Sequence, residues 1–297
     1  MSYQPRRIPR HEFLMLRGVK HRLTWWGEAS ESPVILLHGF MDCGDTWQFL
    51  VDCLPVDWSL VAPDWRGFGG SEWPAGGYWF PDYLADLEGL LDLLTPGASA
   101  RVIGHSMGAN VAALYCGVRP QRLRWLVNLE GLGLPRTQPD MAPERYARWL
   151  DELGQPARAS RYRCVEQLAT VLQQRNPRLT ADRALFVARS WSRPLEGGAA
   201  GEVALAFDPR HRCVNPVLYR REEAEACWAR VTAPMLLIGG AESGHRQRRV
   251  EELTDERFAR LFHDLRTVTL PGVGHMMHHE DPQAVARAIV EFERAHA

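Results

Sequence analysis

The sequence predicts an α/β fold: an eight-stranded, mostly parallel sheet with helices on both faces. Short apolar runs alternate with helix-length amphipathic segments along most of the chain. The later apolar runs are continuous, which is typical of parallel strands that are buried on both faces. The expected strands span residues 12–17, 20–26, 33–37, 58–62, 100–104, 124–129, 234–238 and 266–270.

The first two expected strands differ from the other six. They alternate apolar and polar residues and lie close together, so we expect an antiparallel hairpin at the edge of the sheet. Helices are expected between the later strands, and the clearest span residues 82–94, 107–117 and 283–295.

The alternation breaks between Pro135 and Val231. Helix-like stretches span residues 143–154, 161–175 and 180–191, with a glycine-rich break at 197–201 and hardly a buried-strand signal. Because a structureless loop of this size would be unusual in a compact domain, we expect residues 135–231 to form an inserted helical cap, or lid. The core domain would then comprise residues 1–134 and 232–297.

The charge balance and the lengths of the apolar runs indicate which classes of partner the protein could have. The 297 residues include 35 Lys and Arg against 36 Asp and Glu, a formal net charge of −1. This balance gives no electrostatic argument for nucleic acid or an anionic membrane, and it favours a small-molecule partner. No apolar run approaches the roughly 20 residues of a membrane span, and no signal peptide is evident, so we expect a soluble cytoplasmic protein. The sequence carries no signal for an oligomeric state.

The six cysteines are scattered and show no CxxC spacing, which favours reduced, mostly buried thiols. They are Cys43, Cys53, Cys116, Cys164, Cys213 and Cys227.

The stretch GHSMG (104–108) places Ser106 between a predicted strand and a predicted helix. Gly-x-Ser-x-Gly in this context is the pattern of a nucleophile elbow, a sharp turn that exposes the serine hydroxyl. An ordinary helix N-cap serine is the alternative. Since the other motifs fit a nucleophile, we interpret Ser106 as one.

A serine nucleophile needs a base, and PGVGHMMHHEDP (271–282) offers histidines in a loop before the last helix. We choose His275, which follows the strand exit directly, over His278 and His279, which we interpret as surface or packing residues. The alternative is a metal site formed by these three histidines and Glu280. No other part of the sequence completes a metal pattern, so we expect no metal.

Acyl transfer also needs backbone donors for the developing oxyanion. The turn HGF (38–40) follows the third strand and offers the amide of Phe40. The second expected donor is the amide of Met107, at the start of the helix after Ser106.

Together these motifs resemble the α/β-hydrolase family. The resemblance is carried by HGF (38–40), PDWRGFGGS (63–71), GHSMG (104–108) and GHMMHHEDP (274–282), in that order. It implies a lid after the sixth strand, a Ser–acid–His triad, an acyl-enzyme and no cofactor. Asp64, in the second motif, is expected to be structural.

The triad acid departs from the usual pattern of the family. Ser243 stands where an aspartate normally follows the seventh strand, with Glu242 beside it. Glu130 ends the apolar run of the sixth strand, where a buried carboxylate needs a partner. We prefer Glu130 as the partner of His275 and keep Glu242 as the alternative.

The expected function is hydrolysis of a carboxylic ester, or a related acyl bond, of a small and mostly apolar substrate. A lactonase, thioesterase, C–C bond hydrolase or cofactor-free haloperoxidase would use the same residues. A ligand-binding protein that kept the fold without turnover is the non-catalytic alternative. Four cap aromatics either line the acyl pocket or form the core of the cap: Tyr146, Trp149, Phe186 and Trp191.

Overall fold

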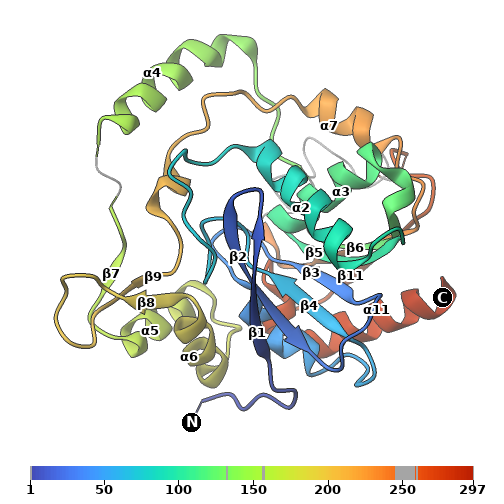
Figure 1. Cartoon of the computed structure of the whole chain (residues 1–297), viewed down its shortest axis with the longest axis horizontal. Helices are drawn as coiled ribbons and strands as arrows, with labels where there is room; N and C mark the ends of the chain where they lie inside the picture. Colours follow the sequence, from blue (N-terminus) through green and yellow to red (C-terminus); the bar gives the residue numbers. More distant parts are fainter. Residues whose placement is uncertain (1, 132, 156–157, 245–257, 259, 297) are drawn as a thin grey trace.

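An eight-stranded sheet runs through the centre of the molecule (Figure 1). The computed structural model describes residues 2–131, 133–155, 158–244, 258 and 260–296. The strand order is β1-β2-β4-β3-β5-β6-β10-β11, and β2 is antiparallel to both β1 and β4 while the other neighbours are parallel. The predicted sheet and its antiparallel edge hairpin are therefore confirmed. The strands are β1 Arg10–Leu16, β2 Val19–Trp26, β3 Val34–Leu37, β4 Leu60–Pro63, β5 Ala100–His105, β6 Leu123–Leu129, β10 Met235–Gly240 and β11 Leu265–Leu270.

Helices cover both faces of this sheet, as predicted. On β3, Ile35 and Leu37 belong to the apolar cluster that includes residues of α2, α3 and α7, whereas Val34 and Leu36 belong to the cluster that includes residues of α1 and α11. Alternate side chains of one strand thus enter two cores, which explains why the strand reads as a continuous apolar run. These helices are α1 Gln48–Val51, α2 Phe80–Leu94, α3 Met107–Val118, α7 Arg221–Trp228 and α11 Pro282–Ala295.

The segment between β6 and β10 adds no strand to the eight-stranded sheet in the part of the chain that the structure describes. It contains the helices α4 Ala142–Leu153, α5 Val165–Arg175 and α6 Ala181–Ser190, close to the three predicted. It also contains a small sheet in the order β7-β9-β8, from Arg161–Tyr162, Val203–Leu205 and Ser192–Pro194. The predicted helix 161–175 is therefore wrong at its start, because strands of two or three residues leave no periodic pattern.

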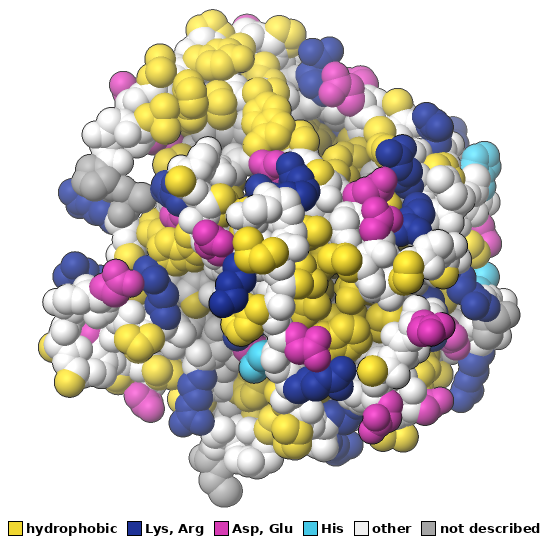
Figure 2. Space-filling model, in the orientation of Figure 1, with side chains coloured by type: hydrophobic (Ala, Val, Ile, Leu, Met, Phe, Trp, Pro, Cys, Tyr) yellow, Lys and Arg dark blue, Asp and Glu magenta, His cyan; other side chains and the backbone are white. Residues whose placement is uncertain are grey.

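Helix α4 lies away from the sheet at the top of Figure 1 and buries none of its residues. Figure 2 shows hydrophobic side chains gathered over this part of the surface. Tyr146, Leu150 and Leu153 of α4 are all exposed. Short helical turns complete the fold: η1 Gly44–Trp47, η2 Pro120–Arg122, η3 Pro139–Met141, η4 Pro209–Arg212 and α10 Met277–Glu280.

All six cysteines are free, as expected. Only Cys43 and Cys116 are buried, however, and the other four are partly exposed, so the expectation of mostly buried thiols is wrong. Among the described residues, no helix is both long enough and apolar enough to cross a bilayer.

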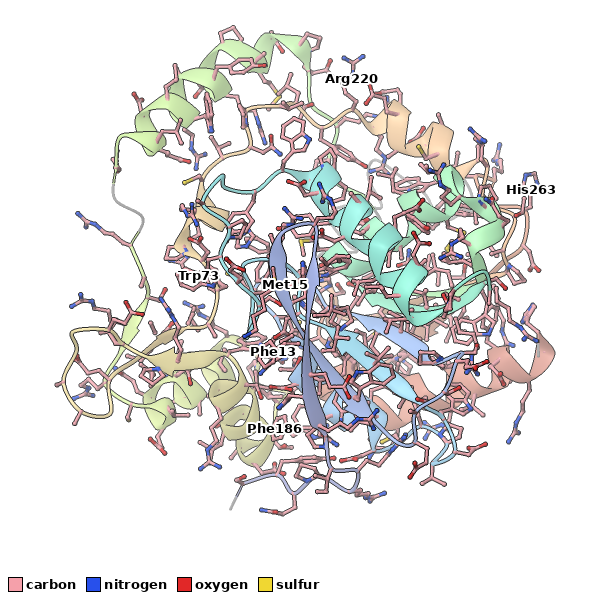
Figure 3. All side chains as sticks on the ribbon, viewed as in Figure 1. Phe13, Met15, Trp73, Phe186, Arg220 and His263 are labelled. Carbon is pink, nitrogen blue, oxygen red and sulfur yellow. The ribbon has the colours of Figure 1, made fainter. Side chains whose placement is uncertain are left out.

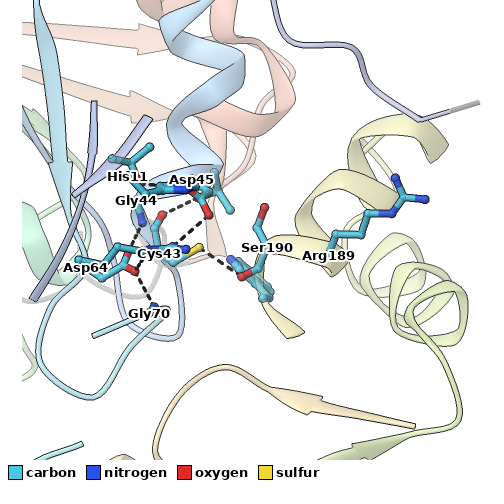
Figure 4. A network of polar contacts seen from close by, with 12 residues as sticks. His11, Cys43, Gly44, Asp45, Asp64, Gly70, Arg189 and Ser190 are labelled. Carbon is cyan, nitrogen blue, oxygen red and sulfur yellow. Dashed lines mark hydrogen bonds and ion pairs between the residues drawn. The ribbon is translucent and has the colours of Figure 1, made fainter. Parts of the chain in front are cut away.

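Asp64 joins the loops that follow β3 and β4 (Figure 4). Its Oδ1 accepts a hydrogen bond from the Gly44 amide at 2.6 Å, and its Oδ2 accepts one from the Gly70 amide at 2.7 Å. Arg22 Nε donates to the same Oδ2 at 2.7 Å. A buried carboxylate with this many donors is stabilised by them, so Asp64 has the structural role that the sequence suggested.

Candidate active site

Ser106 occupies a sharp turn between β5 and α3. Its φ of 50° and ψ of −111° are unfavourable for a residue with a side chain. The turn brings the backbones of neighbouring segments very close to the two glycines. A Cβ on Gly108 would lie 2.2 Å from the Leu37 carbonyl oxygen, and one on Gly104 would lie 2.6 Å from the Ala109 Cα. Only glycine fits at either position, which explains the Gly-x-Ser-x-Gly pattern.

Backbone hydrogen bonds hold Ser106 in this conformation. Its amide donates to the carbonyl of Leu129, the last residue of β6, at 2.9 Å, and its carbonyl accepts from the Asn110 amide at 2.9 Å. The residue remains partly exposed. Neighbouring structure therefore stabilises an unfavourable backbone conformation and leaves the serine accessible.

His275 and Glu130 form a hydrogen-bonded pair across the sheet edge. The distance from His275 Nδ1 to Glu130 Oε2 is 2.7 Å. Because an ionised carboxylate can only accept, His275 must donate from Nδ1, which leaves the lone pair of the neutral ring on Nε2. A neutral histidine with its lone pair on Nε2 can accept a proton from a serine hydroxyl.

The Glu130 carboxylate is buried, and both of its oxygens accept hydrogen bonds. Its side chain is 1% exposed. Oε1 accepts from the Gly240 amide at 2.8 Å, while Oε2 accepts from the Ser243 hydroxyl at 2.6 Å in addition to His275. These donors offset the desolvation of the charge and fix the carboxylate at the ends of β6 and β10.

The turn 38–40 lies directly against Ser106. A Cβ on Gly39 would lie 3.2 Å from the Ser106 Cβ. Within the described residues the Phe40 amide makes no hydrogen bond. Met107 is the first residue of α3, where the N–H has no carbonyl partner inside the helix. The two amides predicted as oxyanion donors thus belong to segments that meet at Ser106.

His38 holds this turn, a role that the sequence did not reveal. Its Nδ1 donates to the Gly39 carbonyl at 2.8 Å, and its Nε2 accepts from the Trp65 amide at 2.9 Å. Burial lowers the pKa of His38 below its ordinary value, which fits a ring that must keep Nε2 unprotonated to accept. The hydrogen bond between His38 and Trp65 therefore connects the turn 38–40 to the segment 63–71.

A cavity of about 580 Å³ opens beside these elements. Phe40 and Met107 both line it, and so do Tyr78, just before α2, and Phe80, the first residue of α2. Trp149 reaches it from α4. The lining is mainly aromatic and apolar, as expected of a small-molecule site.

The other three cap aromatics do not line this cavity. Tyr146 is exposed, and Trp191 donates from Nε1 to Asp42 at 2.7 Å. Phe186 packs edge-on against Tyr3 and Phe49, below β1 in Figure 3. Of the two predicted alternatives, pocket lining is found for Trp149, whereas none of the four aromatics belongs to the buried apolar cluster within residues 135–231.

Comparison with known proteins agrees with this architecture. The model of the alpha/beta hydrolase fold family matches residues 32–282. The protein belongs to the α/β-hydrolase family. A serine hydrolase-like protein of Danio rerio is 27% identical over 90% of this chain and 83% of its own length. A 2-(acetamidomethylene)succinate hydrolase of Mesorhizobium japonicum is 27% identical over 89% of each chain. The thioesterase domain from the curacin biosynthetic pathway superposes with a TM-score of 0.82, at 24% identity, over 96% of this chain and 99% of its own.

This α/β-hydrolase departs from the usual pattern of its family at the acid position. Glu242 is on the surface, with its side chain 53% exposed, and its carboxylate lies 4.0 Å from Arg178. The structure brings Glu130 to His275 and leaves Glu242 apart. Ser243, at the usual acid position, donates to Glu130. The serine at the position where the family usually has an aspartate was the only sequence feature that could have indicated the hydrogen bond between Ser243 and Glu130.

The metal ligands considered from the sequence do not converge. His275 faces Glu130, whereas Glu280 accepts from the Gly274 amide at 2.6 Å and from Asn176 Nδ2 at 2.9 Å. His278 and His279 are both buried, so the packing interpretation fits them and the surface interpretation is wrong.

Proposed function

We propose that this protein is a serine hydrolase that cleaves a carboxylic ester, or a related acyl bond, of a small and mostly apolar substrate through an acyl-enzyme on Ser106. The hydrogen bond between Glu130 and His275 carries the proposal, because it orients the histidine Nε2 as a base next to the strained Ser106 turn. The serine hydrolase-like relative from Danio rerio supports the same chemistry.

In the first half-reaction, His275 Nε2 takes the proton of the Ser106 hydroxyl while the oxygen bonds to the substrate carbonyl carbon. The Phe40 and Met107 amides donate to the oxyanion that forms. His275 then gives the proton to the leaving-group oxygen, the carbon–oxygen bond breaks, and the alcohol departs.

In the second half-reaction, water takes the place of the alcohol. His275 removes a proton from the water as it attacks the acyl carbon, and then returns that proton to Ser106 as the acid leaves. Glu130 acts throughout on His275: it fixes the tautomer and stabilises the imidazolium that forms twice in each cycle. No cofactor is needed for this sequence of steps.

We propose that residues 135–231 act as a cap that selects the substrate. The support is that Trp149 and Leu153 of α4 and several residues of 210–216 line the same cavity as Phe40 and Met107. An apolar acyl group would pack between the aromatic side chains of the cap and those of residues 78–83.

The test is turnover of p-nitrophenyl esters of increasing acyl length by the wild-type enzyme, Ser106→Ala and Trp149→Ala. We expect Ser106→Ala to lose at least about 10⁴-fold in kcat, and Trp149→Ala to change the preferred acyl length while keeping the chemistry. Equal turnover by wild type and Ser106→Ala would reject the nucleophile. A panel of lactones and thioesters, run in parallel, compares the related acyl substrates, and a wild-type enzyme inert on all of them would favour the non-catalytic alternative.

A further inference from the structure

A second cluster of histidine and carboxylate side chains lies behind the candidate active site. Asp42 follows the 38–40 turn, His105 ends β5, and His278 lies in α10. One ligand atom from each of these residues lies within 4.8 Å of the other two, and all three residues are buried. None of the three takes part in the proposed hydrolysis.

The relevant atoms of this cluster make no hydrogen bonds within the described part of the chain. They are Asp42 Oδ2, His105 Nδ1 and both ring nitrogens of His278. Buried polar atoms are nearly always satisfied, so several unsatisfied ones in one place indicate a missing partner. A small cation would accept the lone pairs of Asp42 Oδ2, His105 Nδ1 and one ring nitrogen of His278, while the other ring nitrogen of a neutral His278 carries the proton.

The Asp42–His278 distance fits a shared cation better than a direct hydrogen bond. Asp42 Oδ2 and His278 Nε2 are 3.6 Å apart. A hydrogen bond between these atoms would be about 2.7–2.9 Å long. Two ligands on one tetrahedral Zn²⁺, each about 2.1 Å from the metal, are separated by roughly 3.4 Å. The observed spacing is close to this second value.

The state of His105 also suits a ligand. Its Nε2 is 2.9 Å from the His275 carbonyl oxygen, which can only accept, so His105 donates from Nε2 and carries its lone pair on Nδ1. A Cβ at position 39 would lie 2.8 Å from this Nδ1, and glycine there keeps the approach open. Metal-bound histidines commonly donate their other ring nitrogen to a backbone carbonyl in this way.

We infer that Asp42, His105 and His278 form a binding site for one divalent transition-metal ion such as Zn²⁺ or Co²⁺. Two imidazole nitrogens and one carboxylate oxygen favour these ions over Mg²⁺ or Ca²⁺, which prefer all-oxygen sites. Water would supply the fourth ligand. The ring of His105 lies 4.7 Å from that of His275, between the proposed metal and the proposed catalytic base.

The test is titration of the full-length, metal-free protein with Co²⁺ at pH 8, read by visible absorption, with bound Zn²⁺ counted by elemental analysis after equilibrium dialysis. We expect one ion per chain and the intense visible bands of four-coordinate Co²⁺, without the charge-transfer band that a cysteine ligand gives. Affinity should fall as the pH is lowered, because protons compete for the histidines.

Asp42→Asn is the sharpest variant. The asparagine oxygen can still accept from the Cys43 amide, the Thr46 hydroxyl and Trp191 Nε1, which all donate to Asp42 Oδ1. Only the metal-facing oxygen is replaced. We expect at least about tenfold weaker binding in Asp42→Asn and in His278→Gln, with folding checked by circular dichroism.

His11→Gln is the matched control, since His11 pairs with Asp45 at 2.8 Å near the surface, and it should bind as wild type does. A wild-type protein that binds no Co²⁺ or Zn²⁺ at micromolar concentrations overturns the site. Unchanged binding by a folded Asp42→Asn does so as well. Both readouts are independent of turnover, so they stand apart from the proposed hydrolase activity.

Discussion

Two carboxylate–histidine pairs lie on either side of one imidazole ring and differ in almost every physical respect. Glu130 and His275 are 2.7 Å apart, and the His275 side chain is 20% exposed. Asp42 and His278 are 3.6 Å apart, and the His278 side chain is fully buried. His105 packs against both histidines, with ring centroids 4.7 Å and 4.4 Å away.

This difference shows that residue type alone does not define a site. In the first pair the carboxylate has donors for both oxygens, and the histidine donates to it from Nδ1 at a short distance. In the second pair one carboxylate oxygen is satisfied by three donors and the other faces two histidines without a hydrogen bond. The first arrangement suits proton transfer, and the second suits a bound cation.

The largest expected effect separates the two candidate partners of His275. Glu130→Gln should lower kcat on an ester substrate by about 10⁴-fold, because the amide removes the charge that stabilises the imidazolium and disturbs the tautomer. The kcat of Glu242→Gln should stay close to that of the wild type, since the Glu242 side chain is exposed on the surface. Steady-state kinetics measures both. A collapse of Glu242→Gln with an active Glu130→Gln would reverse the assignment.

Substitution of Asp42, in the second pair, should lower the stability of the fold. Asp42→Ala leaves the Cys43 amide, the Thr46 hydroxyl and Trp191 Nε1 without their acceptor. Because each unsatisfied buried donor costs about 1–3 kcal/mol, we expect a loss of about 3–5 kcal/mol in the free energy of unfolding. Urea denaturation checks this value. Asp42→Asn, which keeps the acceptor, should lose much less, and equal losses would contradict the account.

Acid should destabilise the protein through its buried histidines. Burial lowers the folded-state pKa of His105 and of His279 well below 6.5. The unfolded chain therefore binds protons that the folded one does not, and stability falls as the pH drops below about 6.5. Each histidine contributes a slope of about 1.4 kcal/mol per pH unit. Unfolding of His279→Gln between pH 7 and 5 should show a shallower slope than wild type, and an identical slope would refute this origin.

The smallest effect concerns Ser243. Ser243→Ala removes one of the donors to Glu130 but leaves the Gly240 amide and His275. We expect kcat/KM to fall about tenfold, or ~1.4 kcal/mol. The double variant Glu130→Gln/Ser243→Asp places a carboxylate at the position usual in the family and should recover part of the lost rate. A double variant no faster than Glu130→Gln would show that this position does not reach His275.

Most of the sheet could be predicted because buried parallel strands are continuous apolar runs, as in Val34–Leu37. Strands such as Arg161–Tyr162 could not, since two residues carry no periodicity. The preference for Glu130 came from a charge at the end of a buried strand. The Asp42–His105–His278 cluster was beyond sequence reasoning, because its members are far apart in the chain and only the packing of a loop, the end of β5 and α10 brings them together.

The central claim is that Ser106 is the nucleophile, and covalent labelling tests it most directly. Wild-type protein is treated with a fluorophosphonate probe and analysed by intact mass and peptide mapping, with Ser106→Ala as the control. The account predicts one probe per chain, attached to Ser106, and none on the variant. An unlabelled wild-type protein, or equal labelling of Ser106→Ala, would contradict it.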